Sequence, residues 1–474
     1  IMSMRTPLIA AGIVLGTCVL AYVLLCAERV QQHWLIGLSA LLFGYMLFSR
    51  SFAYLGVAPL YVGDLMLAFG LLALLLGGGL GLVLRSPVVW LLIGLLLLGV
   101  LRTAPYLPIY QMDALRDGVT WGYGLFALIT AACLLRTGWI ERVVEQYSRW
   151  MPWFLIWAPI SFMLIRLAGS AIPILPGSNV PLLYLKPGDT AVHLAGTAAF
   201  MFLGLQTHRS DQRSHMPHEW TWWAAWLIGA LLMTSANRGG MLAIAVAALL
   251  VSVLWPRGKW WKAAVLSLIV ASLLFVSSVF FAFDPEIQLS KTYTISPSQV
   301  LLNFQSVFED TGQSTLENTR QWRLDWWNTI IDYTFHGEYF WTGKGFGINL
   351  ADDDGFQVKA DSSLRSPHNG HLTFLARAGV PGFALWIVLQ STFAISLLVA
   401  YLRARRMQHD QWAKTIVWIL AYWMAFMVNA SFDVTLEGPQ QGIWFWSLFG
   451  FGIAVLLSYR SKATALQHNR RTFS

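Results

Sequence analysis

Hydrophobic residues occur along the whole chain in runs close to the length of a membrane span. A helix needs about 20 apolar residues to cross the hydrocarbon core of a bilayer. The thirteen candidate runs are 7–25, 34–49, 64–84, 87–101, 118–135, 150–166, 190–207, 220–236, 240–255, 263–282, 379–402, 415–431 and 443–459. This pattern predicts an all-α, polytopic membrane protein.

Lysine and arginine gather in alternate loops between these runs. The basic loops are 136–149, 208–218, 256–262 and 403–414, and the tail after 459 is basic as well. Because basic loops stay in the cytoplasm, they place the C-terminus there. The opposite, outer face then receives 102–117, 167–189, the tip at Arg238, 283–367 and 432–442. Arg5 places the N-terminus inside too, so we expect about twelve crossings, with the surplus run within 7–63.

Composition agrees with a membrane location. Hydrophobic residues make up 56% of the 474 residues and charged residues only 12%, whereas soluble domains carry about 25% charge. The 24 tryptophans cluster at the ends of the runs, as expected for side chains that prefer the membrane interface. The three cysteines show no metal-ligand spacing and predict no disulfide framework. We expect membrane lipids as neighbours and no nucleic-acid partner.

One long loop, 283–367, divides the predicted helices into two groups. It holds 12 acidic and 6 basic residues, although the whole chain has a net charge of +8. A large acidic segment on the outer face is expected when positive charge stays in the cytoplasm. The predicted organisation is an N-terminal helix bundle (1–282), the outer loop with amphipathic helices (283–367), C-terminal membrane helices (368–459) and a basic cytoplasmic tail (460–474).

A helix is predicted over 314–335 within that loop, opened by the capping-box pattern of Ser314 and Glu317. At helical spacing, three tryptophans and two arginines share one broad stripe, namely Trp322, Trp326, Trp327, Arg320 and Arg323. Such a stripe is typical of a helix that lies on the outer leaflet, with its guanidinium groups at the height of lipid phosphates. A helix that packs against the protein is the alternative.

Arg238 stands in "NRGG" (237–240), between two apolar runs with almost no loop. An arginine at this depth is costly, so it is expected to face a water-filled cavity or an anion. The two glycines allow a backbone or a ligand to approach closely. A turn arginine without a ligand is the alternative.

Two further loop motifs suggest structure rather than chemistry. "TGKGFGIN" (342–349) lacks the spacing of a phosphate loop, so it predicts tight packing, with backbone contact to a ligand as a weaker alternative. The acidic triplet Asp352 to Asp354 is a possible cation site, but such triplets are more often solvated, and we expect no metal and no cofactor. Asp433, in the last outer loop, is a further acidic candidate for the site.

His368 and Asn369 follow the long loop directly and begin a membrane helix, which needs neither residue for insertion. Neutral histidine is the usual proton acceptor near pH 7, and arginines grip phosphate oxygens bidentately. A base and several arginines on the outer face are what glycan transfer from a lipid diphosphate requires: the arginines stabilise the leaving diphosphate, and the histidine activates the attacking hydroxyl.

These motifs resemble the bacterial O-antigen ligase family. The family signature is His followed by Asn, Ser or Gln, nine residues, and a glycine-containing tetrad, which here is His368-Asn369 followed by "GVPG" from Gly379 to Gly382. "NRGG", the arginines at 320 and 323, "GKGFG" and the position of the long loop also match. The resemblance covers roughly 220–460.

The resemblance implies a metal-independent, inverting glycosyltransferase with a GT-C-like membrane fold. Its substrates would be O-antigen on undecaprenyl diphosphate and lipid A–core, and its site would face the periplasm from the bacterial inner membrane. The catalytic histidine of the family corresponds to His368, and its diphosphate-binding arginines to Arg238 and to Arg320 or Arg323. Asn369, Gly379 and Gly382 support the site, and the family's outer-loop aspartate corresponds less clearly to Asp433.

Four other functions remain open from the sequence. O-antigen polymerases and protein O-oligosaccharyltransferases share the histidine and arginine pattern. A transporter usually carries acidic residues or broken helices at mid-membrane, whereas the runs here carry almost no acidic residue at mid-depth and the chargeable groups gather at the outer face. A metal-dependent lipid-sugar transferase usually has acidic residues in its first outer loops, where this chain offers only the separated Asp64, Asp113 and Asp117.

Overall fold

The computed structural model describes residues 27–57, 60–176, 178, 180–208, 219–256, 287–290, 293–295 and 314–472. The expected spans 7–25 and 263–282 therefore lie outside the described residues. The helices are α2 (Ala27–Phe48), α3 (Arg50–Ala53), α4 (Val62–Gly77), α5 (Leu80–Val83), α6 (Pro87–Thr103), α7 (Leu107–Tyr110), α8 (Met112–Gly122), α9 (Gly124–Thr137), α10 (Ile140–Ala168), α11 (Pro187–Phe202), α12 (Glu219–Ala236), α13 (Arg238–Leu254), α16 (Ser314–Phe335), α17 (Leu350–Asp353), α18 (Gly370–Arg406), α19 (Asp410–Ala430) and α20 (Pro439–Thr472).

Short elements fill some of the connections. Four 3₁₀ helices are η1 (Ala104–Tyr106), η2 (Gly169–Ala171), η3 (Leu205–His208) and η4 (Thr435–Glu437). Two antiparallel hairpins pair β1 (Gly56–Val57) with β2 (Leu60–Tyr61) and β3 (Ile287–Ser290) with β4 (Tyr293–Ile295). None of these strands extends a larger sheet in the described part of the chain, so the fold is helical.

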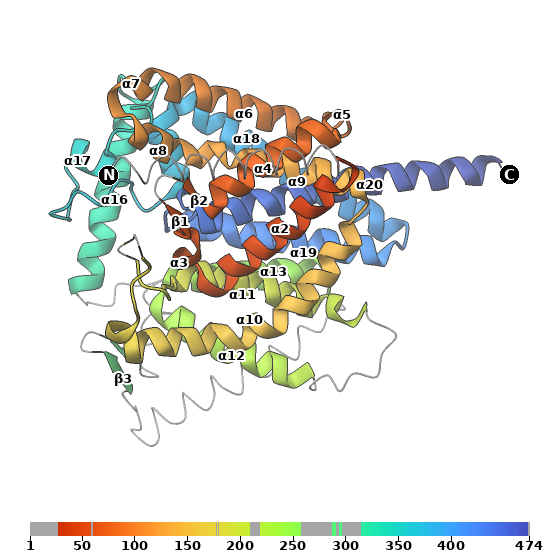
Figure 1. The fold of residues 1–474 in the computed structure, drawn as a ribbon, viewed down its shortest axis with the longest axis horizontal. Helices are drawn as coiled ribbons and strands as arrows, with labels where there is room; N and C mark the ends of the chain where they lie inside the picture. The colour runs from red at the N-terminus through yellow and green to blue at the C-terminus, as the bar shows by residue number, and fades with distance from the viewer. Residues whose placement is uncertain are drawn as a thin grey trace, which may run out of the picture.

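The long helices run between two ends of the molecule, and the loops of each end lie together (Figure 1). One end, which we call the outer end, holds the segments after α2, α6 and α10 together with α16 and α17. There Ser49 forms a β-bridge with Tyr184, and Arg102 Nη2 donates to the Trp341 carbonyl oxygen at 2.6 Å. Segments far apart in the sequence therefore meet at this end.

The opposite end, which we call the basic end, holds the start of α10 and the C-terminal part of α20 (Figure 1). The guanidinium of Arg405 lies 4.2 Å from the centre of the Trp255 ring, and Gln31 donates to the carbonyl oxygen of Gly78 at 2.9 Å. The described basic loops 136–149 and 403–414, which the sequence predicts to be cytoplasmic, thus lie at the same end of the molecule.

Five described helical segments are long and apolar enough to cross a membrane, and a sixth is added if α8 and α9 count as one bent span. The five are Pro87–Tyr110, Ile140–Ala171, Gly370–Arg406, Asp410–Ala430 and Pro439–Lys462. The shorter apolar helices α4 and α13 lie beside them. The protein is therefore a multi-pass helical membrane protein.

Two expected spans are interrupted by glycine. The run 64–84 divides into α4 and α5 at Gly78 and Gly79, whose φ angles of 67° and 99° suit a residue without a Cβ. The run 118–135 belongs to α8 and α9, which bend by 43° between Gly122 and Gly124. The hydrophobic pattern located both runs but did not show that the helix stops within them.

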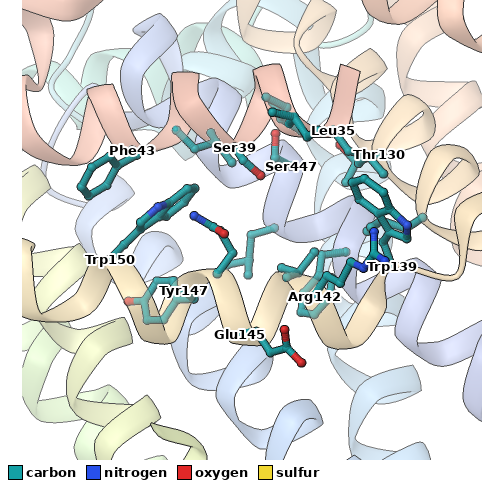
Figure 2. Close-up of a pocket in the computed structure, with 18 of the residues that line it drawn as sticks. Leu35, Ser39, Phe43, Thr130, Trp139, Arg142, Glu145, Tyr147, Trp150 and Ser447 are labelled. Atoms are coloured by element: carbon teal, nitrogen blue, oxygen red, sulfur yellow. The ribbon is translucent and has the colours of Figure 1, made fainter. Parts of the chain in front are cut away.

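A cavity of about 530 Å³ opens between α2 and α10 in the half of the bundle nearest the basic end (Figure 2). Ser39 and Phe43 line it from α2, and Trp139, Arg142 and Trp150 from α10. The cavity lies at the opposite end from His368, and its lining includes no residue that the sequence predicts for the site. It is therefore separate from the site described next.

Candidate functional site at the outer end

The start of α18 fixes the backbone around His368. The Asn369 side chain caps the helix, because its Oδ1 accepts from the amides of His371 and Leu372 at 3.0 and 3.1 Å. Just before the cap, the Pro367 carbonyl oxygen accepts from Trp327 Nε1 at 2.8 Å. Between these two anchors His368 has a φ of 52°, in the left-handed region that side chains rarely adopt. Strain of this kind persists only where its surroundings impose it, and it is typical of functional sites.

His368 faces Asp433 from the loop between α19 and α20. Its Nδ1 lies 3.7 Å from Asp433 Oδ1, within ion-pair reach but too far for a formed hydrogen bond. The His368 side chain is 32% exposed, whereas that of Asp433 is 8% exposed. With Nδ1 turned to the carboxylate, Nε2 remains for a ligand. The pair thus combines an exposed imidazole with a buried carboxylate.

Asp433 is also held by Lys186, 247 residues earlier in the chain. Lys186 Nζ lies 2.5 Å from Asp433 Oδ1, and the Val434 amide donates to the same oxygen at 2.7 Å. Burial acts to raise the pKa of Asp433, but the nearby His368 ring and Lys186 ammonium outweigh it and hold that pKa well below its ordinary value. Asp433 is therefore a carboxylate that lies between the Lys186 ammonium and the His368 ring.

Arg323 reaches the same loop from α16. Its Nη1 donates to the Phe432 carbonyl oxygen at 3.1 Å, while its Nε makes no hydrogen bond within the described residues. Burial lowers the pKa of the Arg323 guanidinium, opposed by the charge of Asp433, and the group stays charged at neutral pH. Arg320, one turn earlier, is exposed. Arg323 is thus the arginine of this pair that the structure places beside Asp433.

Arg238 begins α13, behind an Asn237 cap whose Oδ1 accepts from the Gly240 amide at 2.7 Å. A Cβ placed on Gly239 would lie 2.9 Å from the Cβ of Phe432. The helix start at Arg238 therefore packs directly against the loop that carries Asp433. The absence of a side chain at Gly239 permits this approach.

Three helices thus begin around the Asp433 loop, namely α11, α13 and α18. The first amides of a helix point their N–H groups outward, and the helix dipole gives this end a partial positive charge. Helix starts of this kind favour phosphate and other anions. Asn237 and Asn369 cap two of these helix starts, and three cationic side chains lie at the same part of the outer end, namely Lys186, Arg238 and Arg323.

Gly379 and Gly382 shape α18 rather than the site itself. Gly379 has a φ of 68° inside the helix, and a Cβ there would lie 2.6 Å from the Phe340 carbonyl oxygen. At this break the "GKGFG" turn joins the helix, because the Lys344 and Gly345 amides donate to the carbonyls of the preceding turn of α18 at 2.7 and 3.0 Å. At Gly382, a Cβ would collide with the Ala378 side chain. The prediction that "GKGFG" packs tightly is confirmed.

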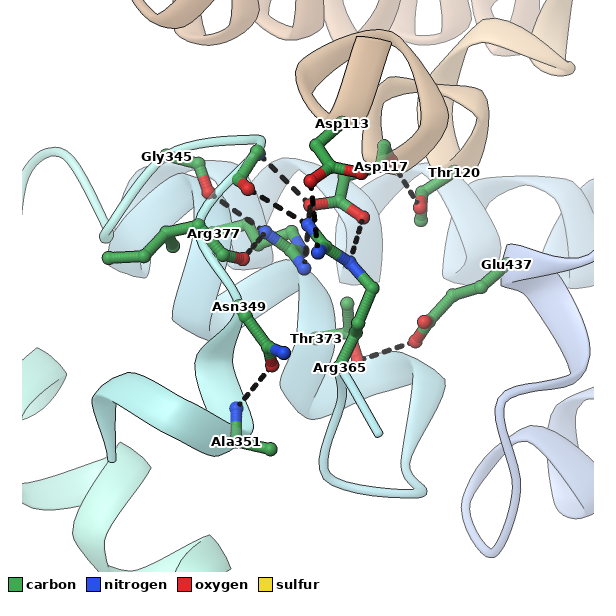
Figure 3. Close-up of polar contacts among 12 residues, drawn as sticks. Asp113, Asp117, Thr120, Gly345, Asn349, Ala351, Arg365, Thr373, Arg377 and Glu437 are labelled. Carbon is green, nitrogen blue, oxygen red and sulfur yellow. Dashed lines mark hydrogen bonds and ion pairs between the residues drawn. The ribbon is translucent and has the colours of Figure 1, made fainter. Parts of the chain in front are cut away.

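A second ionic cluster lies farther along the outer end, around Asp117 of α8 (Figure 3). Asp117 Oδ2 lies 3.0 Å from Arg365 Nη2 and 3.0 Å from Arg377 Nη2, and it accepts from the Gly347 amide at 3.0 Å. Arg365 also reaches Asp113 at 3.3 Å. The two aspartates, four residues apart on one helix, are thus occupied by arginines rather than arranged as an open acidic pair.

Residues 223–387 match the family model described as O-antigen ligase. The chain carries a domain of the O-antigen ligase family. A comparison with curated proteins gives no match. The matched segment contains Arg238, Arg320, Arg323 and His368 but ends before Asp433. The family segment and the last outer loop therefore meet in the folded protein, at His368.

The tryptophans of α16 correct one expectation for this ligase-family domain. Trp326 is fully buried in a small core and stacks on Phe356, with ring centres 5.4 Å apart. Trp327 is half-buried and donates to Pro367, as described above. Trp322 packs against Trp326 at 5.3 Å and faces the His368 ring at 6.5 Å. The stripe packs α16 against α17 and α18, so the placement of Trp326 in the outer leaflet was wrong.

The acidic triplet is exposed at Asp352 and Asp353, as expected for a solvated loop, but Asp354 has a structural role. Lys344 Nζ lies 2.5 Å from both Asp353 and Asp354. The Asp354 side chain is fully buried and accepts from Trp326 Nε1 at 2.6 Å. Within the part of the chain that the structure describes, no group of three or more His, Cys, Asp or Glu residues could hold a metal ion.

The sequence did not reveal Lys186, Arg365 and Arg377 as parts of these clusters. Lys186 carried one signal, because a lysine in an outer loop departs from the pattern that keeps basic residues inside. Arg377 lies in an apolar helix nine residues after His368, where it reads as a costly charge. Neither signal indicates a partner, since the partners lie on other helices.

Proposed function

We propose that this protein transfers an O-antigen glycan from undecaprenyl diphosphate to a sugar hydroxyl of lipid A–core. The observation that carries the proposal is the His368–Asp433 pair, which lies among three helix starts and three cationic side chains. A base and a polyanion site in one place are what transfer from a lipid diphosphate needs. The family match supports a glycosyltransferase of this type.

In the proposed step, an acceptor hydroxyl oxygen attacks the anomeric carbon of the first donor sugar. The bond between that carbon and the phosphate oxygen breaks, and its electron pair leaves on the lipid diphosphate. His368 Nε2 takes the hydroxyl proton, while Asp433 stabilises the resulting imidazolium. Arg238 and Arg323 stabilise the negative charge that develops on the leaving diphosphate. Attack opposite the leaving group inverts the anomeric centre.

The proposal includes the membrane setting. Both substrates carry lipid anchors, so the reaction belongs at the level of the lipid headgroups. We place the outer end at the periplasmic face of the bacterial inner membrane, in a GT-C-like fold of about twelve spans. The basic loops at the opposite end support this orientation.

Reconstitution into vesicles tests the proposal. Purified protein, undecaprenyl diphosphate-linked glycan and lipid A–core should give glycan-capped lipid A–core and free undecaprenyl diphosphate, with and without a chelator. A longer lipid-linked glycan would show a polymerase instead, and capping of an added acceptor protein would show a protein transferase. Donor crossing the vesicle without turnover would show a transporter. Activity that is lost with the chelator and restored by Mn²⁺ would contradict the metal-independent mechanism.

A further inference from the structure

We propose that Lys186 is a positioning residue of this site, which acts through Asp433 to keep the His368 ring neutral and ready to accept a proton. This inference rests on the function proposed above. Its physical basis is that Lys186 and His368 approach the same oxygen, Asp433 Oδ1, at 2.5 and 3.7 Å.

An unshielded carboxylate beside an imidazole would work against a general base. It stabilises the protonated ring, and a ring that is already protonated cannot accept the proton of an incoming hydroxyl. Lys186 offsets much of the negative charge of Asp433. The carboxylate can then orient Nδ1 without holding a proton on the ring in the resting state.

The fold keeps Lys186 charged and in place. Lys186 is the N-cap of α11, where Pro187 fixes the first helical residue. One turn later stands Asp189, which is 1% exposed and whose Oδ1 has no hydrogen-bond partner within the described residues. Burial acts to lower the pKa of Lys186, but the charges of Asp189 and Asp433 outweigh it and raise that pKa. Lys186 therefore remains an ammonium beside the Asp433 carboxylate.

The other charged groups around His368 do not reverse this argument. Arg323 of α16 and the helix start at Arg238 reach the Asp433 loop, and both arginines have the same sign of charge as Lys186. Trp322, the α16 residue nearest the His368 ring, does not titrate. Asp189 is the second carboxyl group, on the same helix turn as Lys186, and burial raises its pKa to about 7. Removal of Lys186 therefore leaves the Asp433 carboxylate without its close cation.

The test is the pH dependence of transfer in vesicles, with the reconstituted full-length protein. The acidic limb of the pH–rate profile is the range in which the rate falls as the base becomes protonated. For Lys186→Met, the midpoint of this limb should move to a higher pH by about one unit, because Asp433 loses its lysine partner. Lys186→Arg should restore the wild-type limb. Asp433→Asn should move the limb downward and lower the maximal rate. The opposite directions separate this role from a loss of folding, which lowers the rate without moving the limb.

Lys344→Met is the matched control, since it also removes a lysine that is paired at the outer end with two carboxylates, of which Asp354 is buried. It is expected to reduce stability and leave the limb in place. If the Lys186→Met protein does not fold and cannot be purified, the pH–rate profile is measured for the double variant Lys186→Met/Asp433→Asn instead. Its limb should coincide with that of Asp433→Asn alone, because Lys186 acts through the carboxylate.

The inference is overturned if the Lys186→Met profile superimposes on that of the wild type, or if the double variant lies above Asp433→Asn. His368→Ala separates this failure from failure of the proposed function. An inactive His368→Ala with an unshifted Lys186→Met profile removes only the role of Lys186. An active His368→Ala removes the proposed base itself.

Discussion

Two aspartates at the outer end, Asp117 and Asp433, each stand between cationic side chains, yet their surroundings differ. Asp117 is enclosed by Arg365, Arg377 and a backbone amide. Both arginines also donate hydrogen bonds to carbonyl oxygens of the loop at 345–348. Asp433 has one close cation, Lys186, while His368 stays at 3.7 Å on a strained backbone.

This difference indicates that the Asp117 cluster has a structural role, whereas Asp433 belongs to the candidate site. A buried ion cluster in which every donor is used has nothing left to offer a ligand, so it fixes the loops that it joins. Around Asp433, by contrast, the His368 side chain is 32% exposed, and the buried Arg323 Nε has no hydrogen-bond partner among the described residues. The exposed His368 ring is what the hydroxyl of a substrate would engage.

The largest effect is expected at Asp117. Asp117→Ala leaves two arginines without their buried partner and should lower the free energy of unfolding by about 3–5 kcal/mol. Asp113→Ala is the control, because its half-exposed side chain makes only a peripheral pair worth up to about 1 kcal/mol. Thermal unfolding in detergent measures both. An Asp117→Ala protein that unfolds like the wild type but does not transfer glycan would place Asp117 in the reaction.

Trp326 tests the same scaffold from α16. Trp326→Ala removes a fully buried ring and its hydrogen bond to Asp354, and should cost about 3–5 kcal/mol of stability. Transfer per folded molecule should change little, because the ring does not reach the site. Comparison of the transfer rate with the folded fraction decides this. A stable variant with weakened use of the lipid-linked donor would restore the interpretation of α16 as a surface helix.

At the site itself, Arg238 is expected to matter for rate and not for stability. Arg238→Ala should reduce transfer by about 100-fold or more, the scale for removal of one group that stabilises developing charge. Arg238→Lys should be partly active, since an ammonium cannot grip two phosphate oxygens at once. Initial rates at saturating donor measure the difference. Full activity with lysine would mean that only the positive charge counts at this position.

The smallest expected effect is the difference in transfer rate between variants of the two α16 arginines, Arg320 and Arg323. Arg323→Ala should slow transfer by at least about tenfold, because Arg323 lies beside Asp433 with a donor to spare. Arg320→Ala, its exposed neighbour one turn away, should be close to the wild type. The same vesicle assay compares them. Equal losses, or a larger loss at Arg320, would move the diphosphate toward the exposed side of α16.

The sequence predicted what is local. Apolar runs marked the described helices, and the His368-Asn369 pair marked the start of α18, because helix periodicity and capping depend on neighbouring residues. The tryptophan stripe of α16 was located correctly but assigned to the wrong surroundings. Periodicity defines a face, whereas what covers that face depends on α17 and α18.

Long-range pairing could not be predicted in this way. Lys186 and Asp433 are 247 positions apart, and Asp117 and Arg365 are 248 apart. The site therefore combines a histidine, recognisable from its motif, with a lysine whose role appears only when α11 packs beside α19. The left-handed backbone of His368 was equally hidden, since it results from anchors on both sides of the residue.

The most direct test of the central claim is the transfer rate of His368→Ala in vesicles, beside His336→Ala as a control. His336 is an exposed histidine at the end of α16, where it pairs only with Asp332. The account predicts that His368→Ala melts like the wild type and loses transfer by about 100-fold or more, while His336→Ala is unaffected. A folded His368→Ala protein that caps lipid A–core at the wild-type rate would contradict it.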